Sequence, residues 1–89
     1  MNIILDGKYM TSKEKTHEYL KKELDLPEYY GNNLDALWDV LMDIDCDLNI
    51  NLINLNIIVN NLGDYGNSLI EVFEDASKSN DNIKLNICI

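Results

Sequence analysis

The alternation of apolar and polar residues predicts three β-strands. The first is the apolar run Asn2-Ile3-Ile4-Leu5, which the turn residues Asp6-Gly7 close. In the second, Leu48, Ile50 and Leu52 alternate with asparagines. In the third, Ile83, Leu85, Ile87 and Ile89 alternate with Lys84, Asn86 and Cys88.

Helical spacing of apolar residues predicts two helices between the first and second strands. Thr11 and Glu14 stand in capping-box register, and the helix that they start should reach about Leu24. His17, Leu20 and Leu24 would lie along one side of this helix, and His17 is interpreted as a residue of the helix surface or the core edge. Pro27 then breaks the helix, and Glu28-Tyr29-Tyr30-Gly31 should form a loop with exposed aromatic character, although Tyr30 is interpreted as a core residue. Asn32 or Asn33 is a good N-cap for a second helix that reaches about Asp43 or Ile44.

Two further helices are predicted between the second and third strands. Leu55, Ile58, Val59 and Leu62 have helical spacing, but asparagine, isoleucine and valine are poor helix formers, so a loop is the alternative there. Residues 63–66 are interpreted as a turn, after which Asn67 or Ser68 caps a helix with Leu69, Val72, Phe73 and Ala76 facing inward. Strands separated by helices imply a parallel sheet with right-handed crossovers, and the 89 residues fit one α/β domain, residues 1–89.

The charge distribution indicates what kind of partner the chain can bind. The formal net charge is -9, and none of the seven lysines lies between Lys22 and Lys78, an interval that holds twelve acids. This excess argues against nucleic acid or an anionic membrane and favours a cationic partner, although an acidic surface can also serve solubility alone. The longest uncharged run, residues 48–63, contains six asparagines and cannot span a bilayer.

The two cysteines suggest the compartment. Cys46 and Cys88 lack the spacing of zinc or redox motifs, and the short apolar start of the chain is not a secretory signal. We therefore expect free thiols in a reducing cytoplasm.

The predicted helix from Leu34 to Ile44 separates apolar and acidic residues onto opposite sides. Its apolar side carries Leu34, Leu37, Leu41 and Ile44, the acidic side carries Asp35, Asp39 and Asp43, and Trp38 and Met42 lie on the border. Like charges at this i, i+4 spacing oppose helix formation by about 0.2–0.5 kcal/mol per pair. Carboxylates beside aromatic residues are typical of a binding surface. The alternative is that Trp38 completes the core and the aspartates are merely solvated.

Catalytic and metal-binding interpretations fit the sequence less well. Paired carboxylates could serve acid–base hydrolysis, but so short a chain has little room for a deep cleft, and His17 has no evident nucleophile partner. Asp43-x-Asp45-x-Asp47 resembles the start of a calcium loop, yet Leu48 replaces the required glycine and Asn54 the required glutamate. We expect neither an enzyme nor a cofactor or metal.

The segment from Leu20 to Asp39, LKKELDLPEYYGNNLDALWD, closely resembles the barstar family of intracellular ribonuclease inhibitors. Its core pattern Pro-Glu-Tyr-Tyr-Gly-x-Asn-Leu-Asp-Ala-Leu-Trp-Asp is long and specific, and Val72-Phe73-Glu74-Asp75-Ala76 adds weaker support. The resemblance implies a three-stranded parallel sheet flanked by about four helices. It also implies one-to-one binding of a secreted microbial ribonuclease by a protein that is monomeric when free.

The resemblance also assigns interface residues. It places Tyr29, Asn33, Asp35, Trp38 and Asp39 at or beside the interface, with Asp39 in the position of a substrate phosphate and Asp75 where the family has a glutamate. Met42 and Asp43 belong to a segment, residues 42–47, that departs from the family pattern beside the expected contact surface. An immunity or antitoxin-like protein for a different basic toxin, or for a partner that is not a nuclease, is therefore the alternative.

Overall fold

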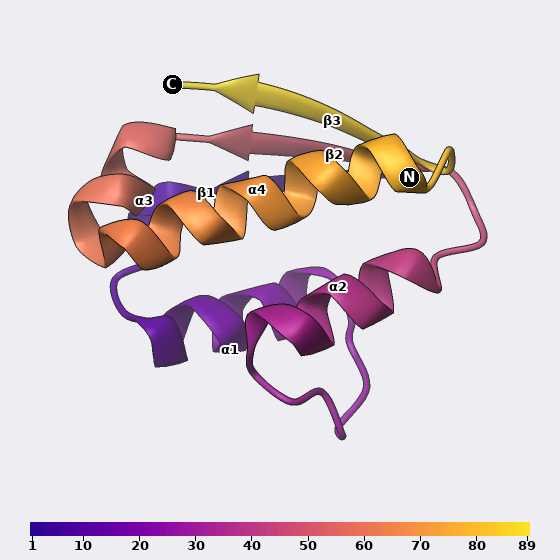
Figure 1. The fold of residues 1–89 in the computed structure, drawn as a ribbon, viewed down its shortest axis with the longest axis horizontal. Helices are drawn as coiled ribbons and strands as arrows, with labels where there is room; N and C mark the ends of the chain where they lie inside the picture. Colours follow the sequence, from indigo (N-terminus) through magenta and orange to yellow (C-terminus); the bar gives the residue numbers. More distant parts are fainter.

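A computed structural model describes the whole chain, residues 1–89. In chain order the elements are β1 (Asn2–Asp6), the 3-10 helix η1 (Gly7–Tyr9), α1 (Lys13–Glu23), α2 (Leu34–Met42), β2 (Leu48–Ile53), α3 (Leu55–Leu62), α4 (Asp64–Ser79) and β3 (Ile83–Cys88). Figure 1 shows α2 with α1 and α4 as its neighbours, and the long α1–α2 loop projecting away from the sheet. The predicted α/β order of elements is confirmed.

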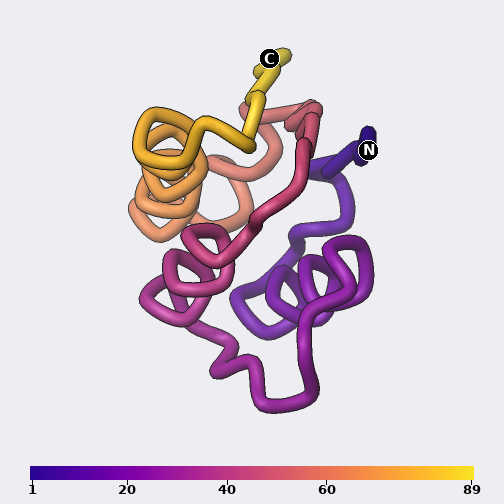
Figure 2. The backbone as a smooth tube through the Cα atoms, turned by 90° about the vertical axis from the view of Figure 1, so that its right-hand side faces the viewer, coloured from indigo at the N-terminus to yellow at the C-terminus, as the bar shows by residue number.

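The three strands form one parallel sheet in the order β1-β2-β3. The register pairs Leu5 with Leu52 and Leu52 with Ile87, so the alternating apolar residues of the three strands share one face. Right-handed crossovers between strands in sequential order place their helices on the same side, as the tube view shows (Figure 2). The opposite face is open, and Ile4 on it is 59% exposed. The protein is therefore a two-layer structure, with its helical layer available for binding.

Side chains from every helix and strand except the short η1 meet in one hydrophobic core between the layers. Its fourteen members are Leu5, Met10, Leu20, Tyr30, Leu37, Leu41, Leu48, Ile50, Leu52, Ile58, Leu69, Phe73, Ala76 and Ile83. All four residues predicted to face inward on the last helix contact this core or belong to it. None of the helices combines the length and apolar composition that crossing a membrane requires.

The start of α1 differs from the prediction by one residue. Ser12, not Thr11, is the N-cap: its backbone is extended, and its Oγ accepts a hydrogen bond from the Lys15 amide at 3.1 Å. The residue three positions after this cap is a lysine, so the reciprocal carboxylate of a capping box is absent. Ser12 is also joined to the helix through its carbonyl oxygen, which accepts hydrogen bonds from the Thr16 amide at 2.9 Å and the Thr16 hydroxyl at 2.6 Å.

Residues 55–62 form helix α3, but the predicted turn after it is wrong. α4 begins at Asp64, and Gly63 alone, at φ 59°, connects the two helices; Asn67 and Ser68 lie within α4 and cap nothing. Gly66 is buried in the first turn of α4, where a Cβ atom would lie 2.8 Å from the Ile58 carbonyl oxygen. Two glycines that resemble a turn in the sequence therefore serve a tight helix–helix junction.

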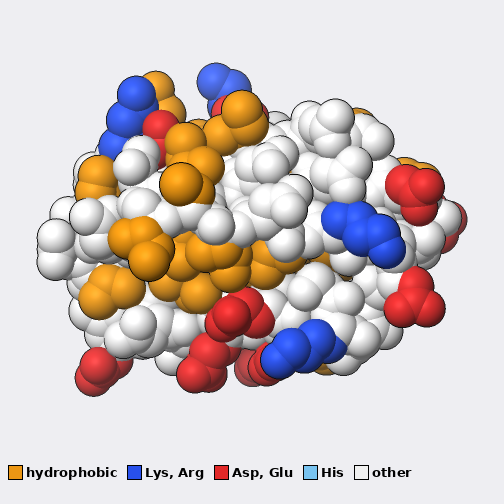
Figure 3. Space-filling view, turned by 90° about the horizontal axis from the view of Figure 1, so that it is seen from above, with side chains coloured by type: hydrophobic (Ala, Val, Ile, Leu, Met, Phe, Trp, Pro, Cys, Tyr) orange, Lys and Arg blue, Asp and Glu red, His pale blue; other side chains and the backbone are white.

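The edge formed by β3 carries apolar and basic residues together. Ile87 and Ile89 are 41% and 81% exposed, and Lys84 and Lys78 are exposed on β3 and α4. Figure 3 shows hydrophobic side chains gathered on this side of the molecule, with both lysines and acids around them. This edge is thus electrostatically mixed, unlike the surface of α2.

Candidate partner-binding face

The exposed side of α2 carries three carboxylates in a row. Asp35, Asp39 and Asp43 are all exposed, whereas Leu37 and Leu41 on the opposite side are fully buried. Burying each leucine stabilises the helix against the core by about 1.5–3 kcal/mol, which outweighs the like-charge repulsion of about 0.2–0.5 kcal/mol per pair. We call Asp35, Asp39 and Asp43 the α2 acidic face.

No basic side chain neutralises the α2 acidic face. The ion pairs in the structure join Lys8 to Asp6, Lys15 to Glu18 and Lys21 to Glu28, all on other elements. The last turn of α2 contains no basic residue either. The negative potential of this surface is therefore available to a cationic partner.

Asn33 fixes the beginning of α2. Its Oδ1 accepts a hydrogen bond from the Ala36 amide at 2.7 Å, and its Nδ2 donates to the Gly31 carbonyl at 3.2 Å. Asn33 is thus the N-cap, as one of the two predicted candidates. The oxygen and the nitrogen of the Asn33 side chain both make hydrogen bonds within the protein, so this residue supports an interface by holding the loop and the helix together.

The α1–α2 loop presents one tyrosine and buries the other. Tyr29 is 87% exposed, whereas Tyr30 is 5% exposed and belongs to the core, as interpreted from the sequence. The Tyr30 hydroxyl shares a 2.7 Å hydrogen bond with Nδ1 of His17, and Nε2 of His17 shares one of 2.6 Å with the Tyr65 hydroxyl. This chain joins α1, the loop and α4, so the loop is anchored from beneath.

The bridging role of His17 was not evident from the sequence, which suggested a residue at the helix surface or core edge. His17 is 1% exposed, and burial lowers its pKa, which favours the neutral ring. A neutral imidazole has one donor and one acceptor nitrogen, so one tyrosine hydroxyl donates to it and the other accepts. Burial also raises the pKa of both Tyr30 and Tyr65, which keeps their hydroxyls protonated.

Two shallow hollows flank Tyr29. One, of about 260 Å³, is lined by Tyr29, Tyr30, Gly31, Ala36, Asp39 and Val40. The other, of about 250 Å³, shares Tyr29 and Val40 and has Asp25 and Asp43 among its lining residues. The structure thus places Tyr29, Asp39 and Asp43 around two neighbouring hollows that a partner's side chains can enter.

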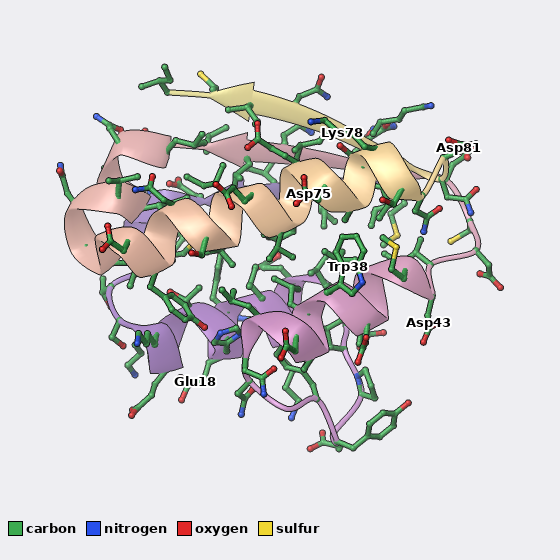
Figure 4. All side chains as sticks on the ribbon, in the orientation of Figure 1. Glu18, Trp38, Asp43, Asp75, Lys78 and Asp81 are labelled. Carbon is green, nitrogen blue, oxygen red and sulfur yellow. The ribbon has the colours of Figure 1, made fainter.

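The remaining predicted interface residues, Trp38, Met42 and Asp75, come from α2 and α4. Trp38 and Met42 are half-buried and pack against the core, so the alternative interpretation, that Trp38 completes the core, holds for part of its ring. Figure 4 shows Trp38 between the two helices, Asp75 on α4 beyond it, and Asp43 at the end of α2. Asp75 is exposed. All eight predicted residues therefore come from α2, the loop before it, the residue that ends it, and the neighbouring α4.

Comparison with known proteins agrees with the fold and with the resemblance to the barstar family. The whole chain, residues 1–89, matches the family model described as Barstar (barnase inhibitor). A protein of Bacillus subtilis (strain 168) named "Putative ribonuclease inhibitor YrdF" is 42% identical over 77 residues, which cover 85% of each chain. Barstar-family proteins are inhibitors and not enzymes, in accord with the expectation from the sequence. The chain belongs to the barstar family of ribonuclease inhibitors.

Proposed function

We propose that this chain inhibits a secreted microbial ribonuclease by covering the enzyme's basic active site with α2 and the loop that precedes it. The observation that carries the proposal is the α2 acidic face, whose three carboxylates are exposed and paired with no lysine. It adjoins the exposed Tyr29 and the hollow that Asp39 lines.

The chemistry of a ribonuclease site explains why a carboxylate can block it. Such a site binds the substrate phosphate with lysine, arginine and histidine, and these groups make charge-assisted hydrogen bonds to a carboxylate equally well. Asp39, in the middle of α2, takes the place of the phosphate in this proposal. Asp35, Asp43 and, from α4, Asp75 extend the negative surface around it, which speeds association by electrostatic steering.

The apolar contribution comes from residues beside the acids. Tyr29 offers an exposed ring, and the exposed parts of Trp38 and Met42 continue the surface toward α4. The Asn33 cap and the Tyr30–His17–Tyr65 hydrogen bonds hold this surface in place before the partner arrives. Such preorganisation lowers the entropy cost of association.

The proposal includes the biological setting. The protein is a cytoplasmic, one-domain monomer that binds the enzyme one-to-one before export and so protects the producing cell. A second candidate is an immunity protein for a different basic toxin. It is favoured by the segment Met42-Asp43-Ile44-Asp45-Cys46-Asp47, whose three exposed aspartates adjoin the proposed contact surface.

A titrated activity assay tests the proposal. Barnase, hydrolysing RNA, should lose activity linearly as the protein is added, with the end point at one molecule of inhibitor per molecule of enzyme. The ribonuclease secreted by the producing organism should behave in the same way. Full activity of both enzymes at excess protein would contradict the proposal and leave the second candidate.

A further inference from the structure

The carboxyl-terminal end of α2 has neither a glycine cap nor a basic residue, the two groups that commonly stabilise a helix end. The last turn of a helix leaves carbonyl oxygens without intrahelical donors, and a following glycine or a nearby basic residue commonly compensates. Here the residue after α2 is Asp43, in a right-handed conformation (φ -84°, ψ -7°), and the last turn holds no basic residue. The Asp43 carboxylate also lies at the negative end of the helix dipole, which is unfavourable.

Two asparagines from the turn between α4 and β3 donate to carbonyl oxygens at and just beyond the end of α2, where the Leu41 carbonyl otherwise accepts only backbone amides, that of Ile44 at 3.4 Å. Nδ2 of Asn80 donates to the carbonyl oxygens of Leu41 at 2.9 Å and of Ile44 at 3.0 Å. Nδ2 of Asn82 donates to the Ile44 carbonyl at 3.1 Å. We call these two side chains the asparagine clamp. It joins segments 36–39 residues apart in the sequence.

Hydrogen bonds of its own backbone and side-chain oxygen hold Asn80 in place. Its backbone amide donates to the Ala76 carbonyl at 2.8 Å, where α4 ends, and its carbonyl accepts from the Ile83 amide at 3.0 Å, where β3 begins. Its Oδ1 accepts from the Asn82 amide at 3.0 Å. Because the amide oxygen is already used, the Nδ2 group must point toward α2. The geometry is thus that of a built contact between elements.

From these contacts we infer that Asn80 is a positioning residue for partner binding, which rests on the function proposed above. The clamp fixes the last turn of α2, with Met42 and Asp43, against α4, which carries Asp75. It thereby sets the spacing of the two helices that form the proposed interface.

The choice of a neutral amide matters for the same reason. A lysine or arginine at this place would satisfy the carbonyls, but its charge would cancel part of the α2 acidic face. Asparagine supplies donors and leaves the net charge at -9. The clamp therefore orders the helix end without weakening the attraction of a cationic partner.

Replacement of Asn80 by alanine tests the inference in the full-length protein. Amide hydrogen exchange at Asp43 and Ile44 should accelerate about tenfold, the size expected when one or two neutral hydrogen bonds are lost. The complex with barnase should dissociate about tenfold faster, whereas association should stay within about twofold because the net charge is unchanged. The matched control is Asn67→Ala. Asn67 is an exposed asparagine within α4 whose side chain makes no hydrogen bond, so its replacement should change neither rate.

A purely structural role would give different results. At a temperature where the variants stay folded, unchanged dissociation despite faster exchange would overturn the positioning role. In an Asp43→Ala background, Asn80→Ala should accelerate dissociation less than it does alone, and full additivity would also overturn it. Asn82→Ala, which removes one bond, is the milder variant should Asn80→Ala not fold. If the wild-type chain does not inhibit barnase, the proposed function fails for that enzyme, and hydrogen exchange alone decides whether Asn80 orders the turn.

Discussion

Replacing Asp39 by alanine should move the stability of the free protein and its affinity for a ribonuclease in opposite directions. In the free protein Asp39 is exposed and makes neither an ion pair nor a side-chain hydrogen bond. Its removal eliminates two like-charge contacts, with Asp35 and Asp43, of about 0.2–0.5 kcal/mol each. Alanine also forms helix better than aspartate. The free energy of unfolding should therefore rise by about 0.5–1.5 kcal/mol.

In the complex the same change removes the group proposed to replace the substrate phosphate. Truncating one member of a buried charge pair costs about 2–5 kcal/mol, a general range to which complexes of the barstar family themselves contribute. This corresponds to a loss of affinity of about 30- to 5,000-fold. No loss of folding can explain such an effect, because the variant is expected to be more stable than the wild type.

The assay combines urea unfolding, followed by the fluorescence of Trp38, with titrated inhibition of barnase. Asp64→Ala is the matched control. Asp64 is also exposed, but it lies in the first turn of α4, where a carboxylate stabilises the helix by about 0.3–1 kcal/mol. The control should lose stability and retain affinity, the reverse of Asp39→Ala. Equal loss of inhibition in the two variants would refute the assignment of Asp39.

Three other changes test the electrostatics and the packing. Burial holds the pKa of His17 below its ordinary 6.5, so below that pH the unfolded chain takes up a proton that the folded chain resists. The free energy of unfolding should therefore be highest above pH 6.5 and should fall as the pH is lowered below 6.5. Urea unfolding between about pH 7 and pH 5 should show that the free energy of unfolding depends less on pH in His17→Gln than in the wild type. An equal pH dependence in the two proteins would contradict this cause. Stopped-flow association with barnase should slow about tenfold or more between roughly 50 and 500 mM NaCl, while a salt-independent rate would argue against steering. Gly66→Ala, whose Cβ would lie 2.8 Å from the Ile58 carbonyl oxygen, should lower the free energy of unfolding by about 1–3 kcal/mol; a urea midpoint equal to that of Asn67→Ala would show that the junction yields.

The strands and α2 could be predicted because their signals are local and agree with the tertiary packing. The alternation at Leu48, Ile50 and Leu52 matches their complete or nearly complete burial in β2. The spacing of Leu37 and Leu41 likewise matches the buried side of α2, which leaves the aspartates exposed. Even the weak helix formers of residues 55–62 adopt the predicted helix, because Ile58 gains burial there.

Two predictions were wrong, the N-cap of α1 and the turn after α3. In each, the local sequence fits more than one structure. Thr11 and Ser12 are both acceptable caps, and in the structure Ser12 takes this place, with its side chain bonded to the Lys15 amide and its carbonyl to Thr16. Gly63 and Gly66 are typical of a turn, but the close contact of Gly66 with the Ile58 backbone gives the second glycine a packing role inside α4. The contact of Gly66 with Ile58 forms only when α3 and α4 pack together, so a local turn signal does not report it.

The sequence by itself determined the acidic character of α2, the loop that precedes it and the order of strands and helices. Periodicity and charge are properties of neighbouring residues, so they can be read along the chain. Only the tertiary structure decided which contacts support the acidic face: His17 lies between two tyrosines, and the Asn80 side chain reaches from the end of α4 to the end of α2. These hydrogen bonds join residues 13–48 positions apart, and their partners become adjacent only after the core has packed.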